Sequence, residues 1–107
     1  MIETHNPKQK PIAIITGVSR GIGKAIAIKF VELGYKVVGV YKSNEKLAKL
    51  LENQHSDIFT IKANVGEEKD VKEVINETIK KFNTIDVVVN NAGIDLFGEI
   101  ETYDTKV

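Results

Sequence analysis

The feature that most constrains the fold of this 107-residue chain is an apolar segment that ends in closely spaced glycines. Ile12 to Thr16 is rich in β-branched residues, which predicts a buried strand. Gly17, Gly21 and Gly23 follow in the spacing G-x-x-x-G-x-G, and a helical pattern begins at once. A strand, a glycine turn and a helix N-terminus together form a pyrophosphate-binding site, because backbone N–H groups and the positive end of the helix dipole point at the anion.

Each of the three glycines has an expected role in such a site. Gly17 permits the turn, Gly21 lets the backbone approach the phosphates, and Gly23 lets the helix pack against the strand. The alternative for a glycine cluster is an ordinary flexible loop, but the flanking strand and helix favour phosphate binding. The predicted binding residues of this loop are Gly17, Ser19, Arg20, Gly21, Ile22 and Gly23.

Strand-like and helical segments alternate along the chain. Strands are expected at 12–16, 37–41, 58–61 and 85–89, and helices begin near Gly21, at Ser43 or Asn44, and at Glu67. This alternation predicts an α/β domain whose parallel sheet is covered by helices on both faces. Right-handed crossovers from a central first strand give the strand order 3-2-1-4, a Rossmann-like, partial doubly wound sheet.

The helical segments also show apolar periodicity, from which their buried faces are predicted. In the first helix the apolar positions that share one face are Ile22, Ala25, Ile26, Phe30 and Leu33. The corresponding stripe in the second helix is Leu47, Leu50 and Leu51. In the third helix it is Val71, Val74, Ile75, Thr78, Ile79 and Phe82.

Composition excludes several classes of function. The 15 basic residues balance the 15 acidic ones, so no charge excess favours a nucleic acid or an anionic membrane as partner. No cysteine is present, and His5 and His55 have no ligand cluster around them, so no metal site is expected. The polar first ten residues lack the apolar core of a signal peptide, and no apolar run could span a bilayer. We expect a cytoplasmic protein with a flexible arm at residues 1–10 and one domain at residues 11–107.

A second loop, Asn90-Asn91-Ala92-Gly93, follows the fourth strand. In the predicted sheet a ligand crevice lies where the strand order switches direction, outside the carboxyl ends of strands one and four. The glycine loop and the Asn90 to Gly93 loop both end there. Two loops far apart in the sequence are therefore expected to converge on one site.

The end of the second strand bears on the choice of cofactor. A carboxylate there would bind the ribose hydroxyls of NAD, but the residues present are Tyr41, Lys42 and Ser43, and Glu45 comes later, in the helix. A cation and a hydroxyl suit the extra 2′-phosphate of NADP, which carries about two negative charges. Arg20 could approach the same phosphate from the glycine loop. The sequence therefore favours NADP over NAD, with a plain surface role for Lys42 as the alternative.

Motifs at three places resemble the short-chain dehydrogenase/reductase family. They are Thr16-Gly17-x-x-x-Gly21-Ile22-Gly23, the Asn90-Asn91-Ala92-Gly93 motif after strand four, and Asn64-Val65, where the family usually has Asp-Val. The resemblance implies that the N-N-A-G motif steadies the sheet and borders the adenosine and nicotinamide riboses. It also implies that Asn64 and Val65 contact the adenine. Asparagine in place of aspartate keeps this contact possible, because an amide both donates and accepts.

The resemblance also shows what this sequence lacks. In the family, catalysis depends on a Ser and a Tyr-x-x-x-Lys pair, in which the tyrosine exchanges a proton with the substrate oxygen. The three tyrosines of this chain are followed four residues later by Gly39, Glu45 and Val107, none of which is a lysine. No residue is therefore expected to be catalytic, and the sequence is expected to be the N-terminal, cofactor-binding part of such an enzyme.

The resemblance implies an NADP-dependent oxidoreductase that reduces a carbonyl or oxidises an alcohol by hydride transfer. Tyr41 to Ser43 and Asn64 are similar to 3-oxoacyl-carrier-protein reductases, whereas Asn91 to Gly98 is as similar to sugar dehydrogenases. The alternatives are a non-catalytic dinucleotide-binding module that associates with another chain, and a folded remnant that binds nothing. The apolar strand at 85–89 lacks a further neighbour, so we expect a homo-oligomer or pairing through this sheet edge.

Overall fold

The computed structural model describes residues 9–19 and 21–91. Most of the predicted N-terminal arm lies outside these residues. Three of the predicted site residues also lie outside them, namely Arg20, Ala92 and Gly93. The structure therefore describes the glycine loop on both sides of residue 20 and the first two residues of the loop after the fourth strand.

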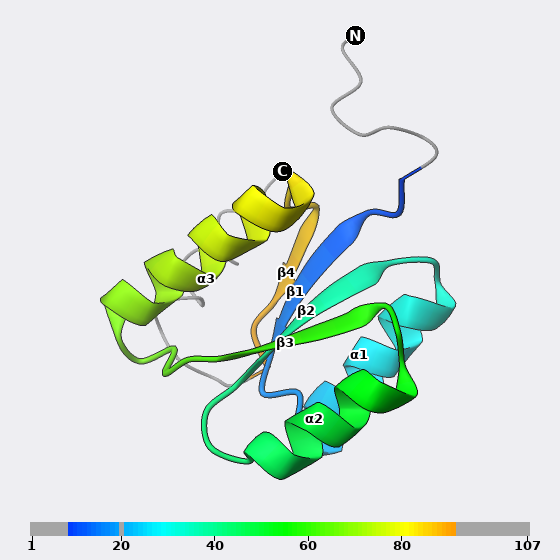
Figure 1. Ribbon diagram of the computed structural model, residues 1–107, viewed down its shortest axis with the longest axis horizontal. Helices are drawn as coiled ribbons and strands as arrows, with labels where there is room; N and C mark the ends of the chain where they lie inside the picture. The colour runs from blue at the N-terminus through cyan, green and yellow to red at the C-terminus, as the bar shows by residue number, and fades with distance from the viewer. Residues whose placement is uncertain (1–8, 20, 92–107) are drawn as a thin grey trace, which may run out of the picture.

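Strands and helices alternate through the described chain, as predicted (Figure 1). They are β1 (Ile12–Thr16), α1 (Gly21–Glu32), β2 (Lys36–Tyr41), α2 (Glu45–Gln54), β3 (Ile58–Lys62), α3 (Glu68–Phe82) and β4 (Val87–Val89). The four strands are parallel and lie in the order β3-β2-β1-β4, which confirms the predicted topology. The carboxyl ends of β1 and β4 are therefore neighbours at the point where the order reverses.

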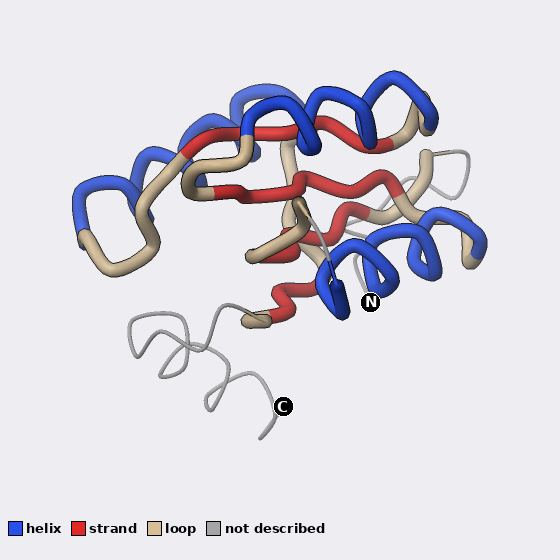
Figure 2. Tube along the Cα trace, turned by 90° about the horizontal axis from the view of Figure 1, so that it is seen from below, coloured by secondary structure: helices blue, strands red, loops and turns tan. Residues whose placement is uncertain are grey.

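The domain has three layers, with α1 and α2 on one face of the sheet and α3 on the other (Figure 2). Alternate residues of each strand point to opposite faces. On one face Ala13 and Ile15 of β1 pack in a buried cluster with Ala27 and Leu51 of the helices. On the other face the buried cluster contains Ile12, Ile14, Val38, Val40, Ala63, Val65, Val71 and Val74. Both faces of β1 are thus packed against apolar side chains, which explains why all of its residues are buried and most are β-branched.

The face that α1 turns to the sheet agrees only in part with the predicted one, since Ile26 and Phe30 pack against the core but other positions differ. Gly23 and Ala27 are its buried residues, whereas Ile22 and Leu33 are 72% and 62% exposed. The smallest side chains face inward because the first turn of the helix packs directly against the glycine loop. Periodicity also misplaced Leu50 of α2 and Ile79 of α3, which are 47% and 42% exposed. Ala48 of α2 is buried in place of Leu50.

The start of α2 settles a choice that the sequence left open. Asn44, and not Ser43, is the N-cap residue, because its side-chain oxygen accepts a hydrogen bond from the Leu47 N–H at 3.3 Å. The helix α3 begins after Glu67, whose side chain makes no capping bond. Its first turn instead contains Glu68 and Asp70, which favour the positive end of the helix dipole.

The strand β4 is shorter than predicted, and Asp86, which precedes it, binds β1 through its side chain as well as its backbone. The Ile12 N–H donates to Asp86 Oδ2, and the Asp86 N–H donates to the Ile12 carbonyl, both at 2.8 Å. Among the described residues β4 pairs with β1 alone, so its other side is an edge of the sheet. Val87, Val88 and Val89 are half-buried there.

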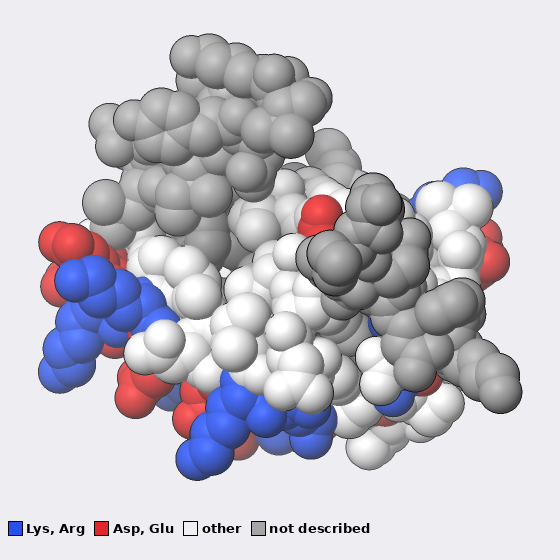
Figure 3. All heavy atoms as spheres, turned by 90° about the horizontal axis from the view of Figure 1, so that it is seen from above, with Lys and Arg blue, Asp and Glu red and all other residues white. Residues whose placement is uncertain are grey.

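Charged side chains of both signs lie next to one another on the surface. On the face seen in Figure 3 they gather along the rim, around a largely uncharged centre. Several form pairs within a helix turn, such as Lys29 with Glu32 in α1 and Lys72 with Glu68 in α3. In the part of the chain that the structure describes, no helix has the length and apolarity needed to cross a membrane.

We predict that Gly39→Ala destabilises the domain through a clash with Val18. A Cβ at residue 39 would lie 2.7 Å from Val18 Cγ2, closer than real Cβ contacts. Overpacking of this kind costs about 1–3 kcal/mol in the free energy of unfolding, which urea denaturation would measure. If the clash is the cause, adding Val18→Ala costs less in the Gly39→Ala background than in the parent. Strictly additive costs would contradict this explanation.

Candidate functional site

The glycine loop is fixed on the end of β2. Gly17 has a φ of 71°, a left-handed conformation that glycine adopts without strain. The N–H groups of Gly17 and Val18 both donate to the carbonyl of Val40, at 2.8 and 3.3 Å. The chain leaving β1 therefore crosses the neighbouring strand before it enters α1. Val18 is fully buried at this crossing and packs against Gly39. A side chain larger than hydrogen at position 39 would collide with Val18.

Gly23 brings the first turn of α1 against this loop. A Cβ at Gly23 would lie 1.8 Å from the carbonyl oxygen of Gly17, which is far inside van der Waals contact. The close approach is therefore between the helix and the loop carbonyl, and it explains why Gly23 is buried on the inner face of α1. No side chain larger than hydrogen fits at this position without moving the helix.

The loop after β4 reaches the same carbonyl. Asn91 Nδ2 donates to the Gly17 carbonyl oxygen at 3.3 Å, and it would lie 2.6 Å from a Cβ at Gly23. Next to it, the buried Thr16 donates through Oγ1 to Asn90 Oδ1 at 3.3 Å. Two loops separated by 74 residues therefore meet at one point, at the carboxyl ends of β1 and β4. The sequence predicted this convergence.

The start of α1 has the properties that an anion requires. Its first turn contains no acidic residue, in contrast to the first turns of α2 and α3. Gly21 has a φ of 65°, and a Cβ added there would have no atom within 4 Å, so the space beside its backbone is open. The N–H groups of the first helical turn have no partner within the helix. An anionic group can therefore bind there to backbone donors and to the positive end of the dipole.

The end of β2 presents a lysine and a serine to solvent. Tyr41 is only 5% exposed and belongs to the core, whereas Lys42 and Ser43 are exposed. Lys42 lies two residues beyond Val40, whose carbonyl anchors the glycine loop. No carboxylate stands between the strand and α2, since Glu45 is already in the first turn of the helix.

The turn after β3 is held by its own polar groups. Asn64 Oδ1 accepts from the Gly66 N–H at 2.9 Å, and the Asn64 N–H donates to Asp70 Oδ2 at 2.8 Å. Val65, between Asn64 and Gly66, is buried in the core that α3 covers. The side-chain oxygen of Asn64 is thus engaged in shaping the turn, which sets the position of the Asn64 amide nitrogen.

Three residues that shape the site were not among the predicted ones. Val18 fills the space above Gly39, Asp70 holds the turn at Asn64, and Asp86 aligns β4 with β1. The role of Asp70 could have been predicted in part, because an acidic residue in the first turn of a helix often accepts a hydrogen bond from a preceding backbone N–H. The described residues contain no group of three His, Cys, Asp or Glu side chains that could hold a metal ion.

Comparison with known proteins relates this chain to short chain dehydrogenases. A family model described as short chain dehydrogenase matches residues 11–107. A 3-oxoacyl-(acyl-carrier-protein) reductase of Staphylococcus aureus is 43% identical over 91 residues, which cover 81% of this chain and 37% of that protein. The chain thus spans little more than a third of this relative.

Solved structures resemble the described fold. A short chain dehydrogenase from Bacillus anthracis superimposes with a TM-score of 0.70 at 28% identity, covering 76% of this chain and 34% of the other. A 3-ketoacyl-(acyl-carrier-protein) reductase from Brucella melitensis, complexed with NADH, gives a TM-score of 0.69 at 26% identity, covering 75% of this chain and 33% of that one.

We predict that Gly23→Ala destabilises the protein. Helix propensity alone would make this change stabilising by up to about 1 kcal/mol. The contact with the Gly17 carbonyl predicts the opposite sign, with a loss of about 3 kcal/mol or more, because the added Cβ meets backbone atoms that cannot move aside. Urea unfolding followed by circular dichroism measures the difference, and an unchanged or increased stability would contradict the packing described here.

Proposed function

Because the chain belongs to the short-chain dehydrogenase family, we propose that residues 11–107 form the cofactor-binding part of an NADP-dependent oxidoreductase. The proposed reaction is reduction of a carbonyl or oxidation of an alcohol. The observation that carries the proposal is the meeting of the Gly17 carbonyl, Gly23 and Asn91 at the carboxyl ends of β1 and β4. In doubly wound sheets a dinucleotide binds at this switch point.

The hydrogen bonds of the loop indicate which groups would bind the pyrophosphate. The N–H groups of Gly17 and Val18 are already donated to Val40, so they hold the loop and not the ligand. The first turn of α1, from Gly21 onward, supplies the donors for the phosphates. Ile22 is exposed beside them and offers an apolar surface to the ligand. When bound, a nicotinamide dinucleotide supplies hydride transfer.

The preference for NADP is inferred from the end of β2. Lys42 and Ser43 follow the strand whose Val40 carbonyl holds the glycine loop, and no carboxylate stands there to bind the ribose hydroxyls of NAD. A lysine and a hydroxyl favour a 2′-phosphate, which carries about two negative charges. Arg20 is proposed as a second cation for that phosphate.

The remaining predicted contacts complete the proposed site. Asn64 and Val65 would border the adenine, with Asn64 acting through its amide nitrogen because its oxygen binds Gly66. Tyr41 is buried and would contribute through its backbone. Asn90 and Asn91 would position the ribose-binding wall, together with the residues that follow them in the sequence, Ala92 and Gly93.

The proposed substrate class is a 3-oxoacyl thioester. The supporting observation is the 43% identity to a 3-oxoacyl-(acyl-carrier-protein) reductase, which favours this class over the sugar substrates that the residues after Asn91 also suggest. No catalytic residue is assigned, because the sequence contains no Tyr-x-x-x-Lys. Homo-oligomer formation or pairing through the edge of β4 remains part of the proposal, as does a cytoplasmic location.

We predict that Lys42→Ala weakens NADPH binding about tenfold, the equivalent of about 1.4 kcal/mol, and leaves NADH binding unchanged. Calorimetric titration of each cofactor into the folded protein measures both affinities. Lys46→Ala is the matched control, because Lys46 is also exposed and lies in the first turn of α2, beyond the strand end. An equal loss for both cofactors would contradict the role of Lys42, and a parent chain that binds neither would contradict the proposed function itself.

A further inference from the structure

The outer side of β3 is the second edge of the sheet. Successive backbone groups of a strand point alternately to its two sides. The Asp57 carbonyl accepts from Val37 and the Ala63 N–H donates to Tyr41, so the odd-numbered residues of this segment face β2. The N–H groups of Ile58 and Thr60 therefore point outward, where a further strand would bind.

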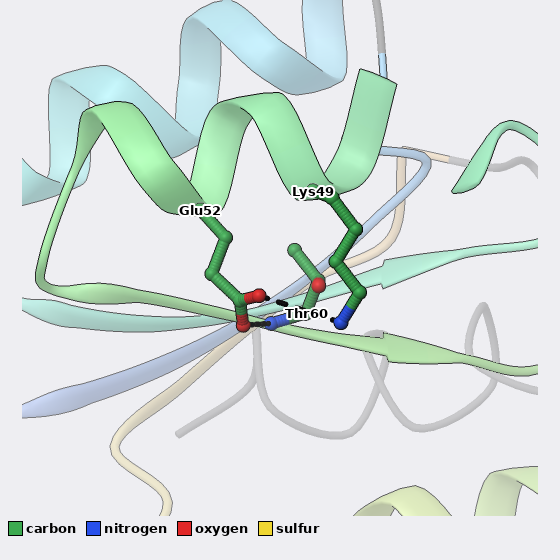
Figure 4. Close-up of polar contacts among 3 residues, drawn as sticks. All are labelled: Lys49, Glu52 and Thr60. Carbon is green, nitrogen blue, oxygen red and sulfur yellow. Dashed lines mark hydrogen bonds and ion pairs between the residues drawn. The ribbon is translucent and has the colours of Figure 1, made fainter. Parts of the chain in front are cut away.

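Within the described residues, two of the three outward donors of β3, those of Ile58 and Thr60 but not that of Lys62, are bonded from the side of α2. The Ile58 N–H donates to the His55 carbonyl at 3.0 Å, in the turn that links α2 to β3. The Thr60 N–H donates to Glu52 Oε2 at 2.9 Å (Figure 4). Glu52 lies near the C-terminal end of α2. The middle of the edge strand is thus bonded to a side chain that descends from the helix above it.

The Glu52 carboxylate is well held in this position. Lys49 Nζ lies 3.4 Å from Glu52 Oε1, so one carboxylate oxygen binds the lysine and the other binds the strand. The Glu52 side chain is 30% exposed, which places the charge at the border between the sheet edge and solvent. A charged acceptor makes a stronger bond to a backbone N–H than a neutral one does.

The strand beneath this carboxylate has a sequence that pairs readily. Four of the five residues of β3, Ile58 to Ile61, are β-branched or aromatic, and only Lys62 at the end of the strand is charged. Such segments at a sheet edge are templates for pairing with a copy of themselves. To add a strand at β3, the partner would have to displace Glu52 from Thr60 and desolvate its charge.

We propose that Glu52 closes the β3 edge against pairing with the β3 edge of a second copy of this chain. The hydrogen bond to Thr60 occupies the central outward donor, and the carboxylate places a charge where the second strand would lie.

The test compares variants of the full 107-residue chain by sedimentation velocity and by amide hydrogen exchange. Glu52→Ala is expected to speed exchange at the Thr60 N–H about tenfold or more and to cause concentration-dependent association beyond that of the parent. Glu52→Gln, which keeps an acceptor oxygen, is expected to show a smaller change in both measurements. Glu45→Ala is the matched control, since Glu45 is an exposed glutamate in the same helix.

A second variant identifies the edge involved. Adding Thr60→Pro to Glu52→Ala removes the outward N–H that a partner strand would bind, while proline is tolerated on the outer side of an edge strand. The double variant is expected to sediment as the parent does. Association that persists in it, or a Glu52→Ala chain that exchanges faster at Thr60 without associating, would overturn the proposal. Unchanged exchange at Thr60 would overturn it as well.

Discussion

The carbonyl group of Gly17 is the point on which the arrangement of this domain depends. It is approached by the first turn of α1 so closely that no Cβ fits at Gly23, and it accepts a hydrogen bond from Asn91. The same residue donates its N–H to Val40 on β2. One residue therefore fixes the relative positions of β1, β2, α1 and the loop after β4. The shape of the proposed anion site follows from these contacts, because they fix the N-terminus of α1 beside the loop after β4.

Sequence reasoning predicted the sheet well, for physical reasons that are visible in particular segments. Ile12 to Thr16 is buried on both faces of the sheet. Its continuous apolar run therefore identified an internal strand from the local sequence alone. Right-handed crossovers then left one sensible strand order. The glycines after this strand predicted the turn, and the strand order predicted the convergence of the two loops.

The orientation of the helices and the polar contacts were harder to predict. Periodicity placed Ile22 and Leu33 on the inner face of α1, but the steric limit at Gly23 rotates the helix so that Gly23 and Ala27 face the sheet. Asp86 and Glu52 bind backbone groups on strands that only tertiary structure brings near them. No local pattern marks such a residue as structural. The two edges of the sheet differ for the same reason, since one has a carboxylate bonded to it and the other is lined by valines.

The central claim is that the glycine loop and the loop after β4 form one dinucleotide site. The most direct measurement is the change in backbone amide chemical shifts when NADPH is titrated into the isotopically labelled chain. We expect the largest changes at Gly21, Ile22 and Gly23, with further changes at Asn64 and Asn91. At the opposite end of the strands lies a cavity of about 390 Å³, lined in part by Lys10, Lys36 and Lys81. Shifts confined to that cavity, with none in the glycine loop, would contradict the account.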